Sequence, residues 1–169
     1  MVERIFLDYS IRKLAQGQGR VEECLALLSE QQVWTRGGAN ENTIGNLVLH
    51  LCGNIQQWVI SGVGGAPQTR DRDAEFAASG GLRIPELQTL LRHTVEQGVA
   101  VIQDVQAERL TETIQVQKYE IKVLEAIYHV VEHFSGHAGQ IIFMTKMLTG
   151  QDLGFYQHLK YAAHTERTP

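Results

Sequence analysis

The sequence has little cysteine. Cys24 and Cys52 are the only two cysteines among 169 residues, and no C-x-x-C spacing is present. Both lie inside apolar helical patterns, so the chain does not have the cysteine framework of a disulfide-stabilised fold. Two buried thiols instead fit a reducing compartment. We therefore expect a soluble, cytoplasmic protein.

Long apolar runs and an excess of positive charge are also absent. A membrane-spanning helix needs about 18 or more consecutive apolar residues, and no run in the sequence approaches that length. The N-terminal segment MVERIFL has no signal-peptide core. The formal net charge is −4, whereas a nucleic-acid-binding surface is basic. The composition thus gives no support for a membrane or a nucleic-acid partner.

The length and the apolar content fit one globular unit. A chain of 169 residues, 43% of them apolar, is long enough to bury one core without disulfides. We predict a single domain spanning residues 1–169.

Helical periodicity dominates the chain. Apolar residues recur every three or four positions in four segments, which is typical of amphipathic helices. The first segment runs from about Ile5 to Gln32, and the second begins at Asn42 or Thr43. The third starts near Pro85, which suits a first helical turn. With the fourth, at about 122–148, these segments predict an all-α four-helix bundle.

The connections differ in character. Residues 62–84 form a long crossover between the second and third helices and a candidate lid for a site. Within it, residues 70–76 carry alternating charges that favour a solvated surface, although a rim segment that anchors an acidic ligand is the alternative. The β-branched run at 111–117 is a candidate extended segment. Residues 153–161 predict a short tail with about one helical turn.

Histidines form the clearest chemical pattern. His133 and His137 are four residues apart and therefore lie on one helix face. His50 sits beside the apolar stripe of the second helix, far away in sequence. If these helices pack side by side, three imidazoles converge, and neutral imidazole is a common ligand of zinc, nickel, copper and iron. A hydrogen-bonded core histidine is the ordinary alternative for each residue alone.

Several neighbours are candidates for supporting roles. His129 lies one turn before His133, but three residues in a line on one helix cannot all reach one ion, so we interpret it as a supporting or structural residue. Asn54 and Gln140 are further candidates to orient the imidazoles. Glu132 is expected to be exposed, and Cys52 is expected to point away from the site. Surface positions are predicted for His93, His158 and His164.

Two motifs resemble those of the DinB-like superfamily. NLVLHL at residues 46–51, followed by Trp58, is similar to its second-helix motif. EHFSGHAGQI at residues 132–141 is similar to its fourth-helix motif, and residues 70–76 resemble one subgroup. The resemblance implies an up-up-down-down four-helix bundle that binds a divalent metal through His50, His133 and His137.

The same resemblance suggests a class of reaction. Characterised members of the superfamily include enzymes that use low-molecular-weight thiols such as mycothiol, bacillithiol and sometimes glutathione. The leading hypothesis is a metal-dependent transferase that adds a thiol cosubstrate to a small electrophile, with zinc or nickel as the metal. A metal-dependent hydrolase of a small substrate, or a non-catalytic bundle with a structural metal, are the alternatives.

The chain is also expected to form a homodimer. The first and third helices have more apolar positions than a narrow bundle seam requires, and the family resemblance suggests the same assembly.

Overall fold

The computed structural model describes residues 1–161, 163, 165–166 and 168–169 of the chain. His164, expected at the surface, lies outside the described residues. Within the described part of the chain, no helix is long and apolar enough to cross a membrane.

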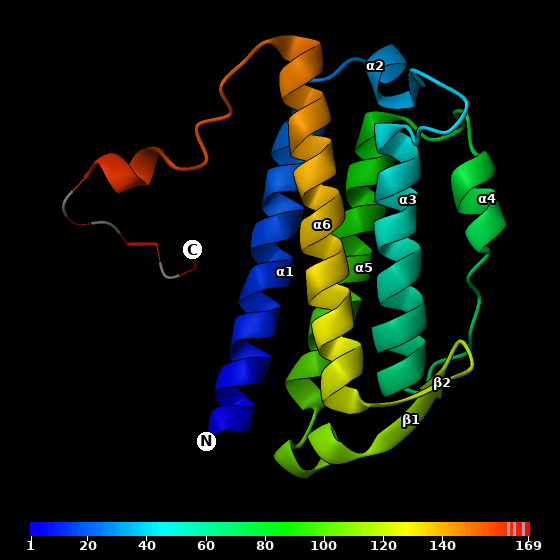
Figure 1. Cartoon of the computed structure of the whole chain (residues 1–169), viewed down its shortest axis with the longest axis vertical. Coiled ribbons are helices and arrows are strands. Elements are labelled where there is room, and N and C mark those ends of the chain that lie inside the picture. The colour runs from blue at the N-terminus through cyan, green and yellow to red at the C-terminus, as the bar shows by residue number, and fades with distance from the viewer. Residues whose placement is uncertain (162, 164, 167) are drawn as a thin grey trace.

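Long helices side by side form the body of the molecule (Figure 1). The first and fourth long helices run toward one end of the bundle, and the second and third run toward the other end. The up-up-down-down order implied by the family resemblance is therefore wrong for this chain. The second and third helices are parallel because the long crossover returns the chain from one end of the bundle to the other. The four helices are α1 (Val2–Ala26), α3 (Ile44–Ile55) with its π-helical continuation η1 (Gln56–Val63), α5 (Ile84–Asp104) and α6 (Val123–Thr149).

Shorter elements fill the connections. The crossover carries α4 (Arg72–Ala77), which packs on the outer side of α3. Between α5 and α6 the chain forms a hairpin, and the tail contains one short 3-10 turn, as predicted. The remaining elements are α2 (Glu30–Trp34), the 3-10 segment Ala107–Thr111, β1 (Thr113–Val116), β2 (Tyr119–Lys122) and the 3-10 turn Gln157–Lys160.

The predicted first helix is too long. Instead of continuing to Gln32, α1 ends at Ala26, and a new helix starts after Ser29. The Ser29 hydroxyl accepts a hydrogen bond from the Gln32 backbone N–H at 3.2 Å, and the Gln32 side chain accepts one from Ser29 N–H at 2.9 Å. This reciprocal capping box satisfies backbone donors at a new helix start, so the chain changes direction without losing its local hydrogen bonds.

The candidate extended segment at 111–117 forms half of a two-stranded antiparallel hairpin. Thr113 pairs with Lys122, and Val116 pairs with Tyr119. Gln117 and Lys118 occupy the turn with positive φ angles of 52° and 73°. Two left-handed residues give a turn whose twist matches that of paired strands. The hairpin covers one end of the bundle (Figure 1).

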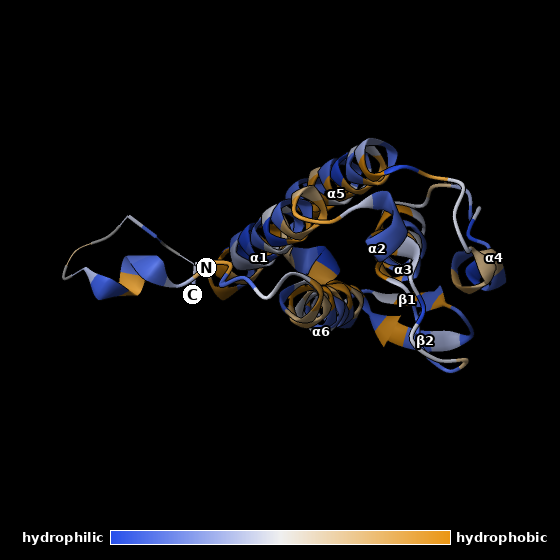
Figure 2. Cartoon of the chain, turned by 90° about the horizontal axis from the view of Figure 1, so that it is seen from above, coloured by the Kyte–Doolittle hydropathy of each residue, from blue (hydrophilic) through white to orange (hydrophobic). Residues whose placement is uncertain are grey.

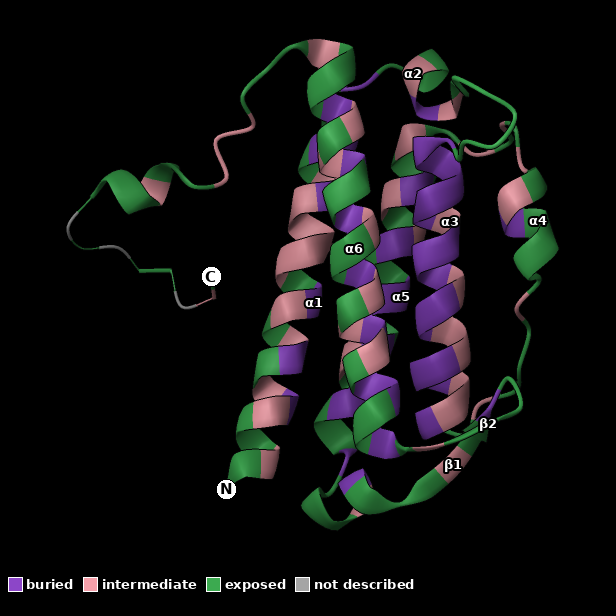
Figure 3. Cartoon of the chain, viewed as in Figure 1, coloured by how far each residue is buried: buried purple, intermediate pink, exposed green. Residues whose placement is uncertain are grey.

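Apolar side chains from all four long helices meet in one buried cluster. Figure 2 shows the bundle from above, and Figure 3 shows buried positions along the faces that the helices turn toward one another. Burial of each large aliphatic side chain contributes about 1.5–3 kcal/mol to folding, so this cluster holds the helices together. Fully buried members include Leu7, Leu14, Leu25, Leu51, Ile55, Leu87, Leu91, Ile102, Ile127 and Ile141.

The surface corrects the reasoning behind the expected homodimer. No large apolar side chain of α5 is exposed, so the additional apolar positions of the third helix are used inside the bundle. Exposed large apolar residues lie instead on α1, such as Ile5, and near the end of α6, such as Phe143 and Met147. Assembly itself stays a prediction.

Two glycines of α1 provide a matched test of helix packing. A Cβ on Gly17 would lie 2.7 Å from the Phe134 ring of α6, whereas a Cβ on Gly19 would meet no atom of the described residues within 4 Å. We predict that Gly19→Ala stabilises the protein by about 0.5–1 kcal/mol through helix propensity. Gly17→Ala is expected to destabilise it by about 1–3 kcal/mol through overpacking. Urea denaturation measures both, and equal stabilisation by the two variants would contradict the close approach of α1 and α6.

Candidate metal centre

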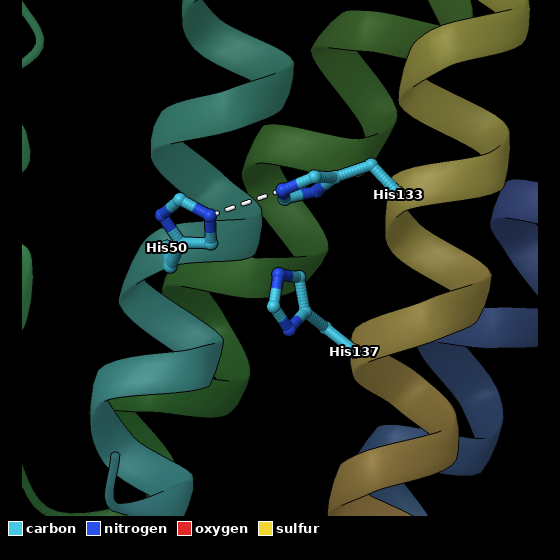
Figure 4. Close-up of side chains that lie close together, drawn as sticks. All are labelled: His50, His133 and His137. Carbon is cyan, nitrogen blue, oxygen red and sulfur yellow. Dashed lines mark hydrogen bonds between the residues drawn. The ribbon is translucent and has the colours of Figure 1, made fainter. Parts of the chain in front are cut away.

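The site lies between α3 and α6. α3 is capped by Thr43, whose hydroxyl accepts a hydrogen bond from the Asn46 backbone N–H at 3.0 Å. This cap sets where the helix starts and therefore which face carries His50. His133 and His137 project from α6 toward His50, as Figure 4 shows. The structure thus brings together the three histidines that the sequence pattern singled out.

The three imidazoles are close enough to share one ion. Nε2 of His50 lies 3.0 Å from Nε2 of His133, and the candidate ligand nitrogens of all three lie within 4.8 Å of one another. A tetrahedral zinc ion with bonds of 2.0–2.1 Å holds two ligand nitrogens about 3.3 Å apart. The spacing of the triad therefore fits a metal ion, with small adjustments of the rings.

Hydrogen bonds at the outer ring nitrogens favour the same interpretation. Nδ1 of His50 lies 2.9 Å from Oε2 of Glu75, and Nδ1 of His137 lies 2.7 Å from Oε1 of Gln140. An acceptor at Nδ1 places the proton on that nitrogen and leaves the Nε2 lone pair available to a metal. Nδ1 of His133 is buried and has no hydrogen-bond partner among the described residues. Two of the three imidazoles are thus oriented by neighbouring oxygens.

Glu75 and Arg70 are site residues that the sequence analysis missed. Their side chains are 9% and 3% exposed, so the expected solvated surface is wrong at these two positions. Between them, Asp71, Arg72 and Asp73 are exposed, as that interpretation predicted. Arg70 Nε donates to Glu75 Oε1 at 2.6 Å and its Nη2 donates to Oε2 at 2.8 Å. The charged segment 70–76 therefore contains one buried ion pair, Arg70–Glu75, which lies beside His50.

The candidate supporting residues have different environments. Gln140 contacts His137, as described above. Asn54 Nδ2 lies 3.4 Å from Nε2 of His129, while Asn54 Oδ1 is buried without a partner. The His129 ring packs 4.3 Å from the Trp58 ring, measured between centroids, and lies outside the triad. Glu132 is exposed. Of these candidates, Gln140 has the most direct contact with the triad.

The other polar residues are placed away from the triad. Cys52 is buried, and its thiol is hydrogen-bonded to the Thr94 side chain of α5. Burial raises the pKa of this thiol to about 12. It therefore cannot serve as a ready nucleophile. His93 is exposed as expected, whereas His158 is half-buried in the tail.

Burial favours the neutral form of two triad imidazoles, His133 and His137. Desolvation, and then the nearby charges of His137, His50, His129 and Arg70, lower the pKa of His133 to about 3. Burial also lowers the pKa of His129 and of His137. Only neutral imidazole can ligate a metal, so these environments maintain the ligand form at neutral pH.

The carboxylate beside the triad stays ionised. Burial alone would raise the pKa of the Glu75 carboxyl, but the hydrogen bonds and charges of Arg70 and His50 outweigh it and lower that pKa. An ionised carboxylate is the stronger acceptor for an imidazole N–H.

An open cavity of about 500 Å³ lies next to the triad, between the crossover and the hairpin. His50 and His133 form part of its wall, so a molecule in the cavity reaches the triad directly. The crossover contributes Arg70 and Arg72, which agrees with its expected position over the site. The hairpin forms the opposite wall, a role that the sequence did not indicate. The lining residues are His50, Asn54, Trp58, Arg70, Arg72, Gln117, Tyr119, Ile121, Glu125, His129 and His133.

These features define a class: a four-helix bundle in which three histidines from two helices could hold a metal beside an open cavity. The sequence matches the family described as "Protein of unknown function (DUF1572)" over residues 2–159. The chain belongs to this family, which is DinB-like. Among curated protein sequences, none matches the chain.

Solved structures share the fold. A conserved protein from Enterococcus faecalis superimposes with a TM-score of 0.73 at 13% identity, covering 84% of this chain and 96% of that one. A DinB-like protein from Bacillus subtilis gives a TM-score of 0.67 at 15% identity, covering 87% and 96%. A mutant of the mycothiol-dependent maleylpyruvate isomerase gives 0.62 at 14% identity, covering 82% and 67%. The predicted DinB-like bundle is thereby confirmed.

The lowered pKa values predict how pH affects the metal-free protein. In the unfolded chain, histidine takes up a proton near pH 6.5, whereas folded His133 resists protonation until about pH 3. The folded state therefore binds fewer protons, and the free energy of unfolding should fall as pH drops below about 6.5. Chemical denaturation with chelator present measures this slope. His133→Gln should reduce it, and the exposed control His93→Gln should reduce it less; equal slopes in all three proteins would contradict the prediction.

Proposed function

We propose that this protein binds one divalent metal ion, zinc or nickel, through Nε2 of His50, His133 and His137. We further propose that it is a metal-dependent transferase, which uses a low-molecular-weight thiol to attack a small electrophile. The observation that carries the proposal is the convergence of three imidazoles, two of which line the wall of an open cavity.

The set of ligand residues supports a catalytic rather than a structural metal ion. Structural zinc usually has four protein ligands, whereas catalytic zinc has three and an open position. Within the described part of the chain, the cluster contains His50, His133 and His137 and no fourth histidine, cysteine or carboxylate. A divalent ion held there would supply Lewis-acid chemistry by lowering the pKa of a water or thiol that binds it. The chain itself would supply the orientation of the imidazoles and the walls that shape access.

Charge in the cavity favours a thiol cosubstrate over simple hydrolysis. Glutathione and bacillithiol carry carboxylates, which arginine recognises well. Arg72 is exposed at the cavity, and its guanidinium stacks over the Phe76 ring with the carbon 4.9 Å from the centroid. Arg70 is already paired with Glu75, so Arg72 is the arginine of this wall available to a ligand. The mycothiol-dependent isomerase among the structural relatives supports the same choice.

Metal content tests the first part of the proposal. Protein prepared without chelator should bind one zinc or nickel ion per chain, measured by elemental analysis and by competition with a chromophoric chelator. His133→Ala should abolish stoichiometric binding because it removes one of the three ligands and leaves only two. The matched control His93→Ala should retain the full amount. Full metal content in His133→Ala would disprove the ligand assignment.

Thiol binding tests the second part. Nickel- or cobalt-loaded protein should develop a sulfur-to-metal absorption band when titrated with mycothiol, bacillithiol or glutathione. Arg72→Ala should weaken the titration with bacillithiol or glutathione several-fold, because both carry carboxylates. The metal content should not change, because Arg72 lies outside the triad. A metal-loaded protein that gives no band with any of the three thiols would remove the transferase proposal and favour the hydrolase or the structural metal.

A further inference from the structure

One face of the second bundle helix is arranged around the Arg70–Glu75 ion pair. Asn46, His50, Gly53 and Gln57 follow one another at intervals of four, three and four residues, so they form a stripe along α3 and the start of η1. Each of the four contacts the crossover at or beside Glu75. Three of these contacts have no direct part in metal ligation, and they show how the carboxylate is held.

The backbone of Glu75 is fixed by Asn46. The Nδ2 group of this fully buried residue donates to Glu75 O at 2.9 Å and to Ala78 O at 2.7 Å. Its Oδ1 accepts from Thr43 N–H at 3.0 Å in the cap of α3. One buried amide thus connects the start of α3 to the end of α4. Glu75 is therefore held at a defined height along α3.

The side chain of Glu75 is fixed by Arg70, Gln57 and the absence of a side chain at Gly53. Arg70 donates two hydrogen bonds to the carboxylate, as described above, and its Nη1 donates to Gln57 Oε1 at 2.8 Å. A Cβ at Gly53 would overlap Glu75 Oε1 and lie 2.8 Å from Arg70 Nε. The glycine leaves the space in which the ion pair packs against α3.

The shared nitrogen of His50 has two possible proton arrangements. Its Nδ1 lies 2.9 Å from Glu75 Oε2 and also 2.9 Å from Arg70 Nη2. If the proton is on Nδ1, it is donated to the carboxylate, and the Nε2 lone pair faces His133. If the proton is on Nε2, Arg70 donates to Nδ1. A lone pair of Glu75 Oε2 and the lone pair of His50 Nδ1 then face each other at 2.9 Å, which is repulsive. The ionised carboxylate favours the first arrangement, because Arg70 already has Glu75 as its acceptor.

We propose that Glu75 is a positioning residue for the histidine triad: its carboxylate holds His50 in the Nδ1–H tautomer, so that Nε2 points toward His133 and His137. Arg70, Gln57, Asn46 and Gly53 hold that carboxylate in place. The consequence for metal binding rests on the proposed function, whereas the tautomer of His50 does not.

The tautomer is measured by the ¹⁵N shifts of the imidazole in the metal-free protein. The wild-type protein should show His50 protonated at Nδ1. In Glu75→Gln, Arg70 should retain the amide oxygen, which turns the amide NH₂ toward Nδ1 and shifts His50 to the Nε2–H tautomer. Glu75→Ala removes the acceptor altogether. If both variants keep the Nδ1–H form, the positioning role is disproved.

Metal affinity gives the second readout. Loss of an outer hydrogen-bond partner typically weakens metal binding 10–100-fold, so we expect that decrease in zinc affinity for Glu75→Gln, corrected for the folded fraction by circular dichroism. Asp73→Asn changes an exposed carboxylate of the same helix α4 and should retain wild-type affinity. A destabilised Glu75→Gln with unchanged zinc affinity would mean that Glu75 is only structural.

Gly53→Ala tests the arrangement without changing any polar group. The added methyl should displace the ion pair, shift His50 away from the Nδ1–H tautomer and weaken zinc binding in the same direction as Glu75→Gln. Gly19→Ala is the control, because its Cβ meets no atom within 4 Å in the described part of the chain. Unchanged tautomer and affinity in Gly53→Ala would contradict the packing argument.

The two proposals can fail separately. Wild-type protein that binds no zinc or nickel, yet shows the tautomer shift in Glu75→Gln, would overturn the metal proposal and support the positioning role. If the wild-type protein binds stoichiometric metal and both Glu75 variants keep the same metal affinity, the metal proposal is supported and the positioning role of Glu75 in metal binding is disproved.

Discussion

The approach of two imidazole nitrogens to 3.0 Å, between α3 and α6, is the constraint on which the site depends. Two neutral imidazoles cannot face each other through two lone pairs at this distance without repulsion. A proton or a cation must lie between them. In the metal-free protein, one neutral imidazole in its Nε2–H tautomer supplies that proton, and burial, which lowers the pKa of His133 to about 3, disfavours a second proton on that ring. In the proposed metal-bound state, a divalent cation would take the place of this proton and bind both lone pairs at once.

Much of the bundle and of the triad could be predicted because both depend on helical periodicity. His133 and His137 lie on one face through their four-residue spacing alone, and the apolar stripes indicate which faces meet. The direction of the helices could not be obtained in this way, since periodicity is the same in both directions. The end of α1 was also missed. The Ser29 capping box overrides an apolar pattern that continues for another turn.

There is a physical reason why Glu75 could not be recognised as a site residue from the sequence. It lies in a short segment where the four residues before it are exposed. A six-residue helix gives too few turns for periodicity to separate one buried charge from the others. The available signal was on the partner helix. A stripe of asparagine, histidine, glycine and glutamine along α3 is unusually polar for a buried face, and it indicates that something polar packs against it. The hairpin similarly needed its pairing partner, 119–122, to be recognised.

The energetics of the ion pair explain why it marks a site rather than a means of stabilisation. Burying both charges carries a desolvation cost of several kcal/mol per ion, and well-packed apolar residues often serve stability equally well or better. The Arg70 and Glu75 side chains are 3% and 9% exposed, so they incur much of this cost. What apolar residues could not provide is an acceptor for His50 Nδ1–H that stays ionised because arginine is beside it. The crossover therefore places the Glu75 carboxylate, which orients His50, beside the helix pair that brings His133 and His137 close to that imidazole.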